Sequence, residues 1–473
     1  MEKNVQLPGN PRYQPKELTK IFGYDYLYQK AIDVEFAAMY ALYVSGFIDE
    51  KDYALLTPEL KVKIKEEITT TMVDKVEREI THHDVRALVQ LIQSKLPEEL
   101  RRFVHVPLTS YDVLDTARIL QFRDAYKLAL RPSIIKTMYA FLEAIQKEMD
   151  QVQIGRTHGQ HALPITVGFW LATILDRLFE NWKRLDQANK KLCGKISGAV
   201  GAYNAQAGFE MNNFEYLTIS YLKLKPADIS TQILPPERLS DFLYACLLTS
   251  ATLGQFGRDC RNLMRSEINE ISESFGTKQV GSSTMAHKRN PINFENLEGM
   301  WLRNKSEFNK VMDTLISEHQ RDLVNSSIMR DFPIIVVNLQ QQLNTLNREK
   351  DGKSFLQRIS FNKENLEKNF EMSANYILAE PIYLALQLYG YSGDAHELVN
   401  RKLMPKAKEK NISLMEQLKE EILENVLLAK VYRQIPATTR KMLEDPHQYI
   451  GLAKEKTTFI FGKVLEEIRP HLK

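Results

Sequence analysis

The sequence predicts an all-α protein built around a bundle of long helices. Glycine and proline, which interrupt helices, are sparse in the middle of the 473-residue chain. No proline lies between Pro236 and Pro291, and Pro333 is the only proline of the glycine-free stretch 300–351. Segments with the alternating, β-branched pattern of strands are few. These uninterrupted stretches favour long helices and exclude a hairpin-rich β fold.

Composition and charge narrow the class of protein. The chain carries 63 Lys and Arg against 60 Asp and Glu, a net charge of +3, which gives no general attraction for nucleic acid or an anionic membrane. Cys193, Cys246 and Cys260 are scattered without CxxC spacing, which favours a reducing compartment. The polar start lacks a signal-peptide core, and no apolar run approaches the roughly 20 residues of a spanning helix. We therefore expect a soluble, cytoplasmic protein.

The first predicted domain covers residues 1–112 and consists of short helices. Prolines divide it repeatedly, at positions Pro11, Pro15, Pro58, Pro97 and Pro107. The length of the whole chain favours two to three domains, or long elements that are shared between subunits.

The central domain, residues 113–365, is predicted to hold the long helices. One is expected over Leu114 to Asp150 and another over Ile165 to Lys191, where apolar residues recur every three to four positions. A third begins at Pro236, which suits a first helical turn, and continues into the polar run RDCRNLMRSEINEISES. The β-branched run at 334–339 is expected to be helical in this context.

The third domain, residues 366–473, is predicted to return to short helices. Glycine and proline become frequent again, at positions Pro381, Gly390, Gly393, Pro405 and Pro436. No internal repeat is evident along the chain.

The segment GTKQVGSSTMAHKRNPINFEN, residues 276–296, has the composition of a mobile loop. It is polar, rich in serine and placed between two helical segments. Gly276 and Gly281 permit unusual backbone angles, so that neighbouring amides can point at one small anion, and Lys288 and Arg289 add positive charge. The alternative is an ordinary solvated connection between helices.

Within this loop, GSSTMAHKRNP resembles the signature of the fumarase/aspartase superfamily, whose members remove fumarate by β-elimination. Ala286 stands where the superfamily usually has proline. HVPLTSYDVLDTA at 105–117 and GRTHGQHALPITVGF at 155–169 resemble its other two motif regions, in the same order. The resemblance implies a three-domain all-α fold whose long helices form the core of a homotetramer. It also implies active sites shared between three subunits, and chemistry that needs no cofactor.

Four further features resemble the adenylosuccinate lyase family: Arg12-Tyr13, THHDV at 81–85, STQ at 230–232, and HQRDLVNSSIMR at 319–330. In the last pattern two arginines and a serine bind the nucleotide phosphate of the substrate, which implies that role for Arg321, Ser326 and Arg330. Guanidinium groups match phosphate oxygens bidentately, so the assignment is physically sound. Without the resemblance, such an arginine pair would be read as surface charge.

The resemblance assigns the two proton transfers to Ser282 and His158. Elimination from a succinyl-amine removes a proton beside a carboxylate while the nitrogen leaving group gains one, so a base and an acid must act from opposite sides. Ser282 maps onto the base and needs a closed loop and the positive charge of Lys288, because a hydroxyl is a weak base. His158 maps onto the acid, for which an unperturbed pKa of about 6.5 is suitable.

Supporting roles follow from the same resemblance. Glu295 would orient His158, and His83 would contact the phosphate or assist proton transfer. The other implied substrate-binding residues are Arg12, Tyr13, His82, Asp84, Thr109, Ser110, Thr157, Gln232, Ser283 and Asn290. His82 stands where the family commonly has arginine or lysine. Thr109 and Ser110 could alternatively be helix caps, and most other histidines are expected to be structural. No HExxH or CxxC spacing suggests a metal site.

Two alternative functions remain open at this stage. Another fumarate-releasing enzyme of the superfamily, of the argininosuccinate lyase or carboxymuconate cycloisomerase type, would share Ser282 and His158 but would not need the phosphate-binding arginines. A catalytically silent structural homologue is a third possibility, although the complete Ser, His, Lys and Glu set argues against it. The favoured partners are a small nucleotide substrate and further copies of this chain, with no nucleic acid and no membrane.

Overall fold

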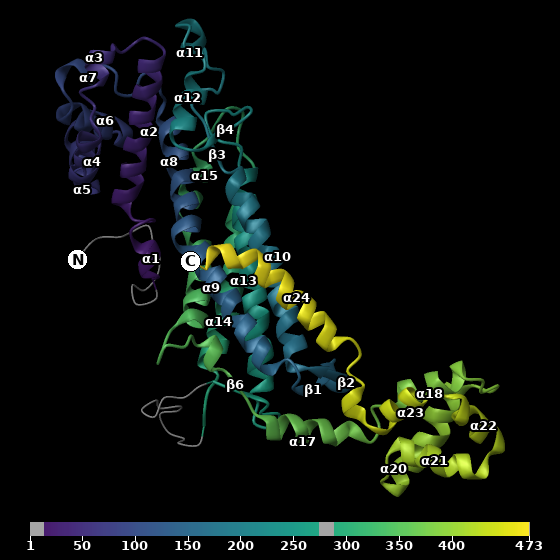
Figure 1. Cartoon of the computed structure of the whole chain (residues 1–473). Helices are drawn as coiled ribbons and strands as arrows, with labels where there is room; N and C mark the ends of the chain where they lie inside the picture. The colour runs from purple at the N-terminus through teal and green to yellow at the C-terminus, as the bar shows by residue number, and fades with distance from the viewer. Residues whose placement is uncertain (1–13, 274–287, 473) are drawn as a thin grey trace. The chain divides into compact units, whose positions relative to one another are not determined.

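The computed structural model describes residues 14–273 and 288–472 (Figure 1). The predicted all-α class is confirmed, since helices make up most of this part of the chain and the strands pair only in two-stranded sheets. Contacts divide the chain into two compact units. Unit 1 comprises Met1–Ile135, Leu178–Gln255 and Asn296–Asn347, and unit 2 comprises Lys136–Arg177, Phe256–Glu295 and Arg348–Lys473. The three-domain division at residues 112 and 365 stays a prediction.

Unit 1 begins with mostly short helices, as the distribution of prolines predicts. Its first elements are α1 (Lys16–Thr19), α2 (Tyr24–Val44), α3 (Glu50–Tyr53), α4 (Pro58–Glu67), α5 (Thr70–Val76), the π-helix η2 (Glu77–Thr81), α6 (Asp84–Lys95) and α7 (Glu98–Arg101). The exception is α2, which has 21 residues because neither glycine nor proline interrupts it.

The helix predicted from Leu114 to Asp150 is present with one irregularity. It consists of α8 (Ser110–Ala125), the π-helical turn η3 (Tyr126–Leu130) and α9 (Arg131–Glu148). Pro132 has no N–H to donate, and the wider turn before it is closed by the bond from the N–H of Arg131 to the carbonyl of Tyr126. The boundary between the two units falls within α9.

The remaining long helices are α10 (Val167–Lys191), α13 (Glu237–Leu263), α14 (Ile292–Asp313) and α16 (Pro333–Asn347). The β-branched run at 334–339 lies in α16 and is buried, so the helical prediction for it is confirmed. Polar side chains tie these helices together within unit 1. Buried Asn304 donates to Ser250 Oγ and to the carbonyl of Ile335, and Asn338 donates to Asn304 Oδ1. Such satisfied networks fix one packing register.

Shorter elements complete unit 1. They are β3 (Cys193–Gly194), α11 (Asn204–Gly208), α12 (Phe214–Tyr221), β4 (Lys225–Pro226) and α15 (Val324–Met329). Residues 314–323 are not helical, so the expectation of uninterrupted long helices after Met300 is wrong there. Asn325, which is buried, donates to the carbonyls of Thr314 and Ile316 and so stabilises the break.

Unit 2 contains the main strands of the described chain. β1 (Val152–Thr157) and β2 (Gln160–Thr166) form an antiparallel hairpin, and β5 (Ile271–Ser272) pairs with β6 (Ser360–Phe361). The β1–β2 hairpin was not predicted from the sequence, and it adjoins a predicted helix. It was also wrong to extend the third long helix past Leu263. The helix ends at Leu263, whose carbonyl accepts from the N–H of Glu270, and Asn269 adopts a left-handed conformation before β5.

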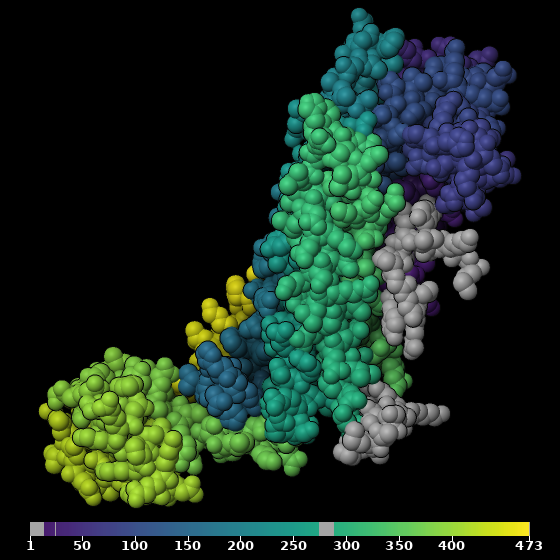
Figure 2. Space-filling view, turned by 180° about the vertical axis from the view of Figure 1, so that it is seen from behind, coloured from purple at the N-terminus to yellow at the C-terminus, as the bar shows by residue number. Residues whose placement is uncertain are grey.

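The C-terminal part of unit 2 consists mostly of short helices, as predicted for residues after 366. They are η4 (Leu356–Arg358), α17 (Lys363–Ala374), α18 (Ala379–Leu388), α19 (Ala395–Glu397), η5 (Leu398–Leu403), α20 (Met404–Lys410), α21 (Leu414–Glu424), α22 (Val426–Gln434), α23 (Ala437–Glu444), η6 (Pro446–Gln448), α24 (Ala453–Ile468) and η7 (Arg469–His471). Helices α18 to α23 share one apolar core that includes Ile382, Val399 and Leu418. Figure 2 shows them as one group coloured light green and yellow.

None of the helices in the described part of the chain is both long and apolar enough to cross a membrane.

Helices α13 and α14 approach each other closely in unit 1 at a single glycine. A Cβ atom added to Gly254 would lie 2.6 Å from the Cβ of Trp301, whereas one added to Gly299, also helical, would meet nothing within 4 Å. The backbone at Gly254 therefore packs directly against the Cβ atom of Trp301. Neither group can move unless one of the two helices shifts.

We expect Gly254→Ala to destabilise the fold by about 1–3 kcal/mol, because the added methyl overpacks this contact. The matched change Gly299→Ala should be neutral or stabilising by up to about 1 kcal/mol, because alanine favours the helix without a clash. Thermal unfolding followed by circular dichroism compares the two variants. Equal midpoints would contradict the close approach of α13 and α14.

Candidate active site

The start of α8 carries Thr109 and Ser110, two of the predicted succinyl-binding residues. The carboxylate of Asp112 accepts a hydrogen bond from the N–H of Thr109 at 2.9 Å, which forms a capping box around the first turn. The alternative reading of this segment as a helix start is therefore confirmed. Both side chains are half-buried, so the cap does not remove them from solvent.

Asp112 fixes a second segment, which the sequence analysis did not identify. This carboxylate is wholly buried and binds the equally buried ammonium group of Lys195. It also accepts hydrogen bonds from the N–H groups of Ser197 at 3.1 Å and Gly198 at 3.2 Å. One charge thus satisfies four donors, counting the N–H of Thr109. Removing two opposite charges from water is costly, and these hydrogen bonds offset that cost.

The turn from Lys195 to Gly201 packs against the predicted STQ segment. Ser197 Oγ lies 2.6 Å from Ser230 Oγ. Gly201 has a φ of +78°, and a Cβ atom there would lie 2.0 Å from the carbonyl oxygen of Ser230. Only glycine fits both the backbone angle and the space. The spacing of glycines at 198 and 201 was the signal available in the sequence.

Gln232 joins the STQ segment to the predicted phosphate-binding segment. The side-chain oxygen of Gln232 accepts a hydrogen bond from Arg321 Nη1 at 2.7 Å. The backbone N–H of Gln232 donates to the carbonyl of Gln320 at 3.3 Å. The guanidinium carbon of Arg321 also lies 3.4 Å from the centre of the Tyr111 ring. The structure thereby brings Gln232 and Arg321 together with Tyr111, the residue after Ser110, in unit 1.

Ser326 and Arg330 are not brought into this network in the part of the chain that the structure describes. Ser326 Oγ donates to the carbonyl of Leu323 at 2.8 Å, and Arg330 is exposed at the end of α15. Asp322 shapes the preceding turn by accepting from the N–H groups of Glu318 and Val324, and these backbone hydrogen bonds lower its pKa. The phosphate-binding role of Ser326 and Arg330 stays a prediction.

His82 and His83 lie between η2 and α6, and Asp84 is the first residue of α6. His82 adopts a left-handed backbone with φ of 52°. His83 Nδ1 lies 3.4 Å from the N–H of Arg86, as a helix cap, and 3.3 Å from Asp84 Oδ1. The two contacts are alternatives, because Nδ1 accepts when it carries no hydrogen and donates when it carries one. Both histidines are exposed, which leaves their rings accessible to a ligand.

His158, the predicted acid, occupies the tip of the β1–β2 hairpin in unit 2. Thr157 pairs with Gln160, and the two residues between them, His158 and Gly159, have φ values of 54° and 76°. Two positive φ angles are typical of the tight turn that matches strand twist. The hairpin therefore holds the imidazole at an exposed position.

A buried carboxylate holds the base of the same hairpin. Both oxygens of Glu270 bind the guanidinium of Arg156, at 3.1 and 2.5 Å, and Glu270 also accepts from Gln153 at 2.8 Å and Asn369 at 2.9 Å. Bidentate pairs of this kind fix orientation as well as position. The pKa of the neighbouring His161 is lowered by burial and by the charge of Arg156.

The end of the signature segment also belongs to unit 2. Lys288 is exposed and Asn290 is half-buried. Helix α14 begins at Ile292, so the predicted loop is wrong for residues 292–296, and Glu295 lies in the first helical turn. Among described residues no contact joins Glu295 to His158, and its orienting role stays a prediction. Ser282, Ser283, Arg12 and Tyr13 lie outside the described residues.

A buried Glu–His pair supports the motif that precedes α8. Glu35 accepts from the N–H of His105 at 2.9 Å, and its other oxygen lies 2.7 Å from His105 Nδ1. Burial disfavours the charged imidazole, but the hydrogen bond and charge of Glu35 outweigh it, so the pKa of His105 is raised. Asp112 adds to this effect and Arg86 opposes it.

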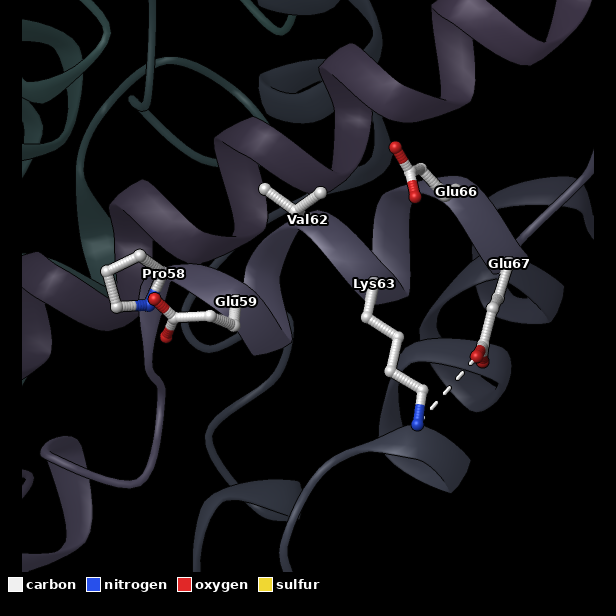
Figure 3. Close-up of a pocket in the computed structure, with 6 residues that line it drawn as sticks. All are labelled: Pro58, Glu59, Val62, Lys63, Glu66 and Glu67. Carbon is white, nitrogen blue, oxygen red and sulfur yellow. Dashed lines mark ion pairs between the residues drawn. The ribbon is translucent and has the colours of Figure 1, made fainter.

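Two other features carry none of the predicted site residues. A groove on α4 is lined by Pro58, Glu59, Val62, Lys63, Glu66 and Glu67, and Figure 3 shows the Lys63–Glu67 ion pair within it. Glu367, Glu371 and His447 are the described residues whose donor atoms lie close enough for a metal ion. His447 lies 2.9 Å from Glu367 and 3.2 Å from Asp445, within hydrogen-bond distance of both carboxylates.

Comparison with known proteins identifies the family. Residues 26–303 match the family described as Lyase. The chain is 36% identical to adenylosuccinate lyase of Pyrococcus horikoshii over 471 residues, covering 98% of this chain and 97% of that protein. It is 33% identical to adenylosuccinate lyase of Archaeoglobus fulgidus, covering 98% and 99%. The chain belongs to the adenylosuccinate lyase family. It is therefore a C–N lyase of the fumarase/aspartase superfamily.

Solved structures of the superfamily share the fold of this adenylosuccinate lyase family member. The 3-carboxy-cis,cis-muconate lactonizing enzyme of Pseudomonas putida has a TM-score of 0.78 at 23% identity, covering 97% of this chain and 98% of its own. A fumarate lyase of Mesorhizobium sp. BNC1 has a TM-score of 0.79 at 20% identity, covering 96% and 100%. At these identities the likeness concerns the fold alone.

The buried pair of this family member gives a stability prediction. Lys195→Met should destabilise unit 1 by about 3–5 kcal/mol, because Asp112 would keep a buried charge without its cation. The matched change Lys190→Met removes an ammonium group that is 72% exposed and paired with Asp186, and should cost about 0–1 kcal/mol. Urea denaturation measures both variants, and similar midpoints for the two would contradict the role of Lys195.

The raised pKa of His105 gives a pH-dependent prediction. A raised folded-state pKa stabilises the fold fully below the unfolded value of about 6.5, and this contribution is lost as pH rises through the folded pKa. We therefore expect His105→Gln to lower the thermal midpoint more at about pH 6 than at about pH 9. His161→Gln should show the opposite trend, because the pKa of His161 is lowered. A pH-independent difference for His105→Gln would contradict the pairing with Glu35.

Proposed function

We propose that the chain eliminates fumarate from adenylosuccinate to give AMP, and from the succinyl-aminoimidazole carboxamide ribotide intermediate of purine biosynthesis. The observation that carries this proposal is the network of Tyr111, Gln232 and Arg321. It joins an arginine suited to a phosphate group to the α8 start, which has hydroxyl groups suited to a carboxylate. The relatives named adenylosuccinate lyase support the same substrate, because they match the chain over nearly its full length.

Recognition of the substrate would use both ends of this network. Arg321, with Ser326 and Arg330, would bind the phosphate, while Thr109 and Ser110 would donate to the succinyl carboxylate. Gln232 accepts from Arg321 through its oxygen. Its carboxamide NH₂ group therefore remains a donor for the succinyl or leaving-group region. Arg12 and Tyr13 would contact the nucleotide, and His82, His83 and Asp84 would line the site; Thr157, Ser283 and Asn290 would complete it.

The chemical step would divide between Ser282 and His158. Ser282 would remove the proton beside the succinyl carboxylate, and the charge of Lys288 would stabilise the negative charge that develops. His158 would then protonate the leaving nitrogen as the C–N bond breaks, which releases fumarate. Its exposed place on a rigid hairpin suits this role, because a donor must be held in one orientation. Glu295 would orient the imidazole, and His83 would assist.

The proposed enzyme works as a cytoplasmic homotetramer whose active sites are shared between subunits, and it uses neither metal nor cofactor. The long helices of the fold support this assembly, since side-by-side packing of such helices between copies buries large apolar faces. Sedimentation of the active protein tests it, and a fully active monomer would overturn the shared-site proposal.

The decisive experiment adds the purified protein to adenylosuccinate and follows the change in purine absorbance. We expect turnover that Ser282→Ala and His158→Gln each reduce by about a hundredfold to ten-thousandfold, because each variant lacks one proton-transfer group. The thermal midpoints of both variants should stay close to that of the unmodified protein.

The controls test whether these losses are specific. Ser94→Ala, at an exposed position of α6, and His161→Gln, in the same hairpin as His158, should retain turnover. Argininosuccinate serves as the control substrate. Turnover of argininosuccinate together with none of adenylosuccinate would overturn the proposed function, and full activity of Ser282→Ala would overturn the assignment of the base.

A further inference from the structure

We propose that Tyr111 is a positioning residue that holds the guanidinium of Arg321 ready for the substrate phosphate. The inference rests on the proposed function, in which Arg321 binds that phosphate, and it adds a residue to which neither the motifs nor the comparisons assign a role. Tyr111 occupies the position between Ser110 and Asp112, so its place in the chain is fixed by the capped start of α8.

The contact between the two side chains is direct. The guanidinium carbon of Arg321 lies over the Tyr111 ring, 3.4 Å from its centre. At this distance the face of the ring attracts the cation and blocks one side of the guanidinium plane. Arg118 lies 5.9 Å from the same ring and is paired with the buried carboxylate of Asp115. Of these two arginines, Arg321 therefore makes the closer contact with the ring.

Hydrogen bonds in the guanidinium plane complete the constraint. Nη1 donates to Gln232 Oε1 at 2.7 Å, and Nε donates to the carbonyl of Asp322 at 3.3 Å. Within the described part of the chain, Nη2 has no hydrogen-bond partner. The ring and the two hydrogen bonds thus fix the plane of the guanidinium and leave one edge to bind an oxygen of the phosphate.

This constraint matters because Arg321 lies in the non-helical segment before α15. A free arginine side chain has several rotatable bonds, and ordering it on binding costs affinity. The capped helix start holds the Tyr111 ring in place, and contact with this ring orders the arginine side chain before the ligand binds. Tyr111 also follows Ser110 directly, so one turn of α8 orients groups for both ends of the substrate.

The test compares Tyr111→Leu, which removes the ring, with Tyr111→Phe, which keeps it. We expect Tyr111→Leu to raise the KM for adenylosuccinate about tenfold with little change in kcat, because a cation–π contact contributes to binding rather than to proton transfer. Tyr111→Phe should behave like the unmodified protein. The dephosphorylated nucleoside of adenylosuccinate should be cleaved equally well by all three proteins. Tyr221→Leu, which removes a tyrosine beneath Lys61, is the matched control.

A second measurement separates this inference from the proposed function. The affinity for AMP and for adenosine is measured directly by calorimetry, without turnover. Tyr111→Leu should weaken AMP binding about tenfold and leave adenosine binding unchanged. The double variant Tyr111→Leu/Arg321→Ala should bind AMP as weakly as Arg321→Ala alone and no more weakly, because both changes act through one guanidinium.

Several results would overturn the inference. They are an equal loss for AMP and adenosine, a defect in Tyr111→Phe as large as that in Tyr111→Leu, or additive effects of Tyr111→Leu and Arg321→Ala. If the unmodified protein binds AMP as described but does not cleave adenylosuccinate, the proposed function fails while the positioning role of Tyr111 stands.

Discussion

The buried ion pair between Asp112 and Lys195 is the constraint on which the rest of the candidate site in unit 1 depends. A carboxylate and an ammonium group are costly to remove from water, and three backbone donors offset part of this cost by converging on the carboxylate of Asp112. Those donors are the N–H groups of Thr109, Ser197 and Gly198. The pair therefore positions the start of α8 and the 195–201 turn. The STQ segment packs against this turn, and its Gln232 orients Arg321 together with Tyr111 of α8.

Buried carboxylates perform the same task elsewhere in the chain. Glu270 holds Arg156 and thereby the hairpin that ends in His158. Glu35 holds the backbone and ring of His105. Glu35, like Asp112, accepts from backbone N–H groups of a non-helical segment, whereas Glu270 accepts from side chains on β1 and α17. In each case the hydrogen bonds offset the cost of burying the carboxylate and hold the donor segment in place. The side chains proposed for chemistry can then remain exposed, because the backbone that carries them is held in place.

The helical architecture was predictable because it depends on local signals. Long stretches without internal proline became α10, α13, α14 and α16, and the first 112 residues, which prolines divide repeatedly, became mostly short helices. The errors came where tertiary contacts overrule local preference. The polar run after Leu263 is compatible with a helix, yet the chain turns there and Glu270, which is wholly buried, donates its N–H to the carbonyl of Leu263. The β1–β2 hairpin escaped notice because His158 occupies a left-handed position that is usually taken by asparagine or glycine.

The sequence by itself determined the all-α class, the family and the residue types available for chemistry, because each of these resides in a contiguous motif or in local periodicity. Only the tertiary structure decided how these residues support one another. Asp112 and Lys195 are 83 positions apart, and Gln232 and Arg321 are 89 apart. No periodic pattern links such pairs, since their contact follows from how helices and turns pack. The stacking of Arg321 on Tyr111 belongs to the same class and became visible only in three dimensions.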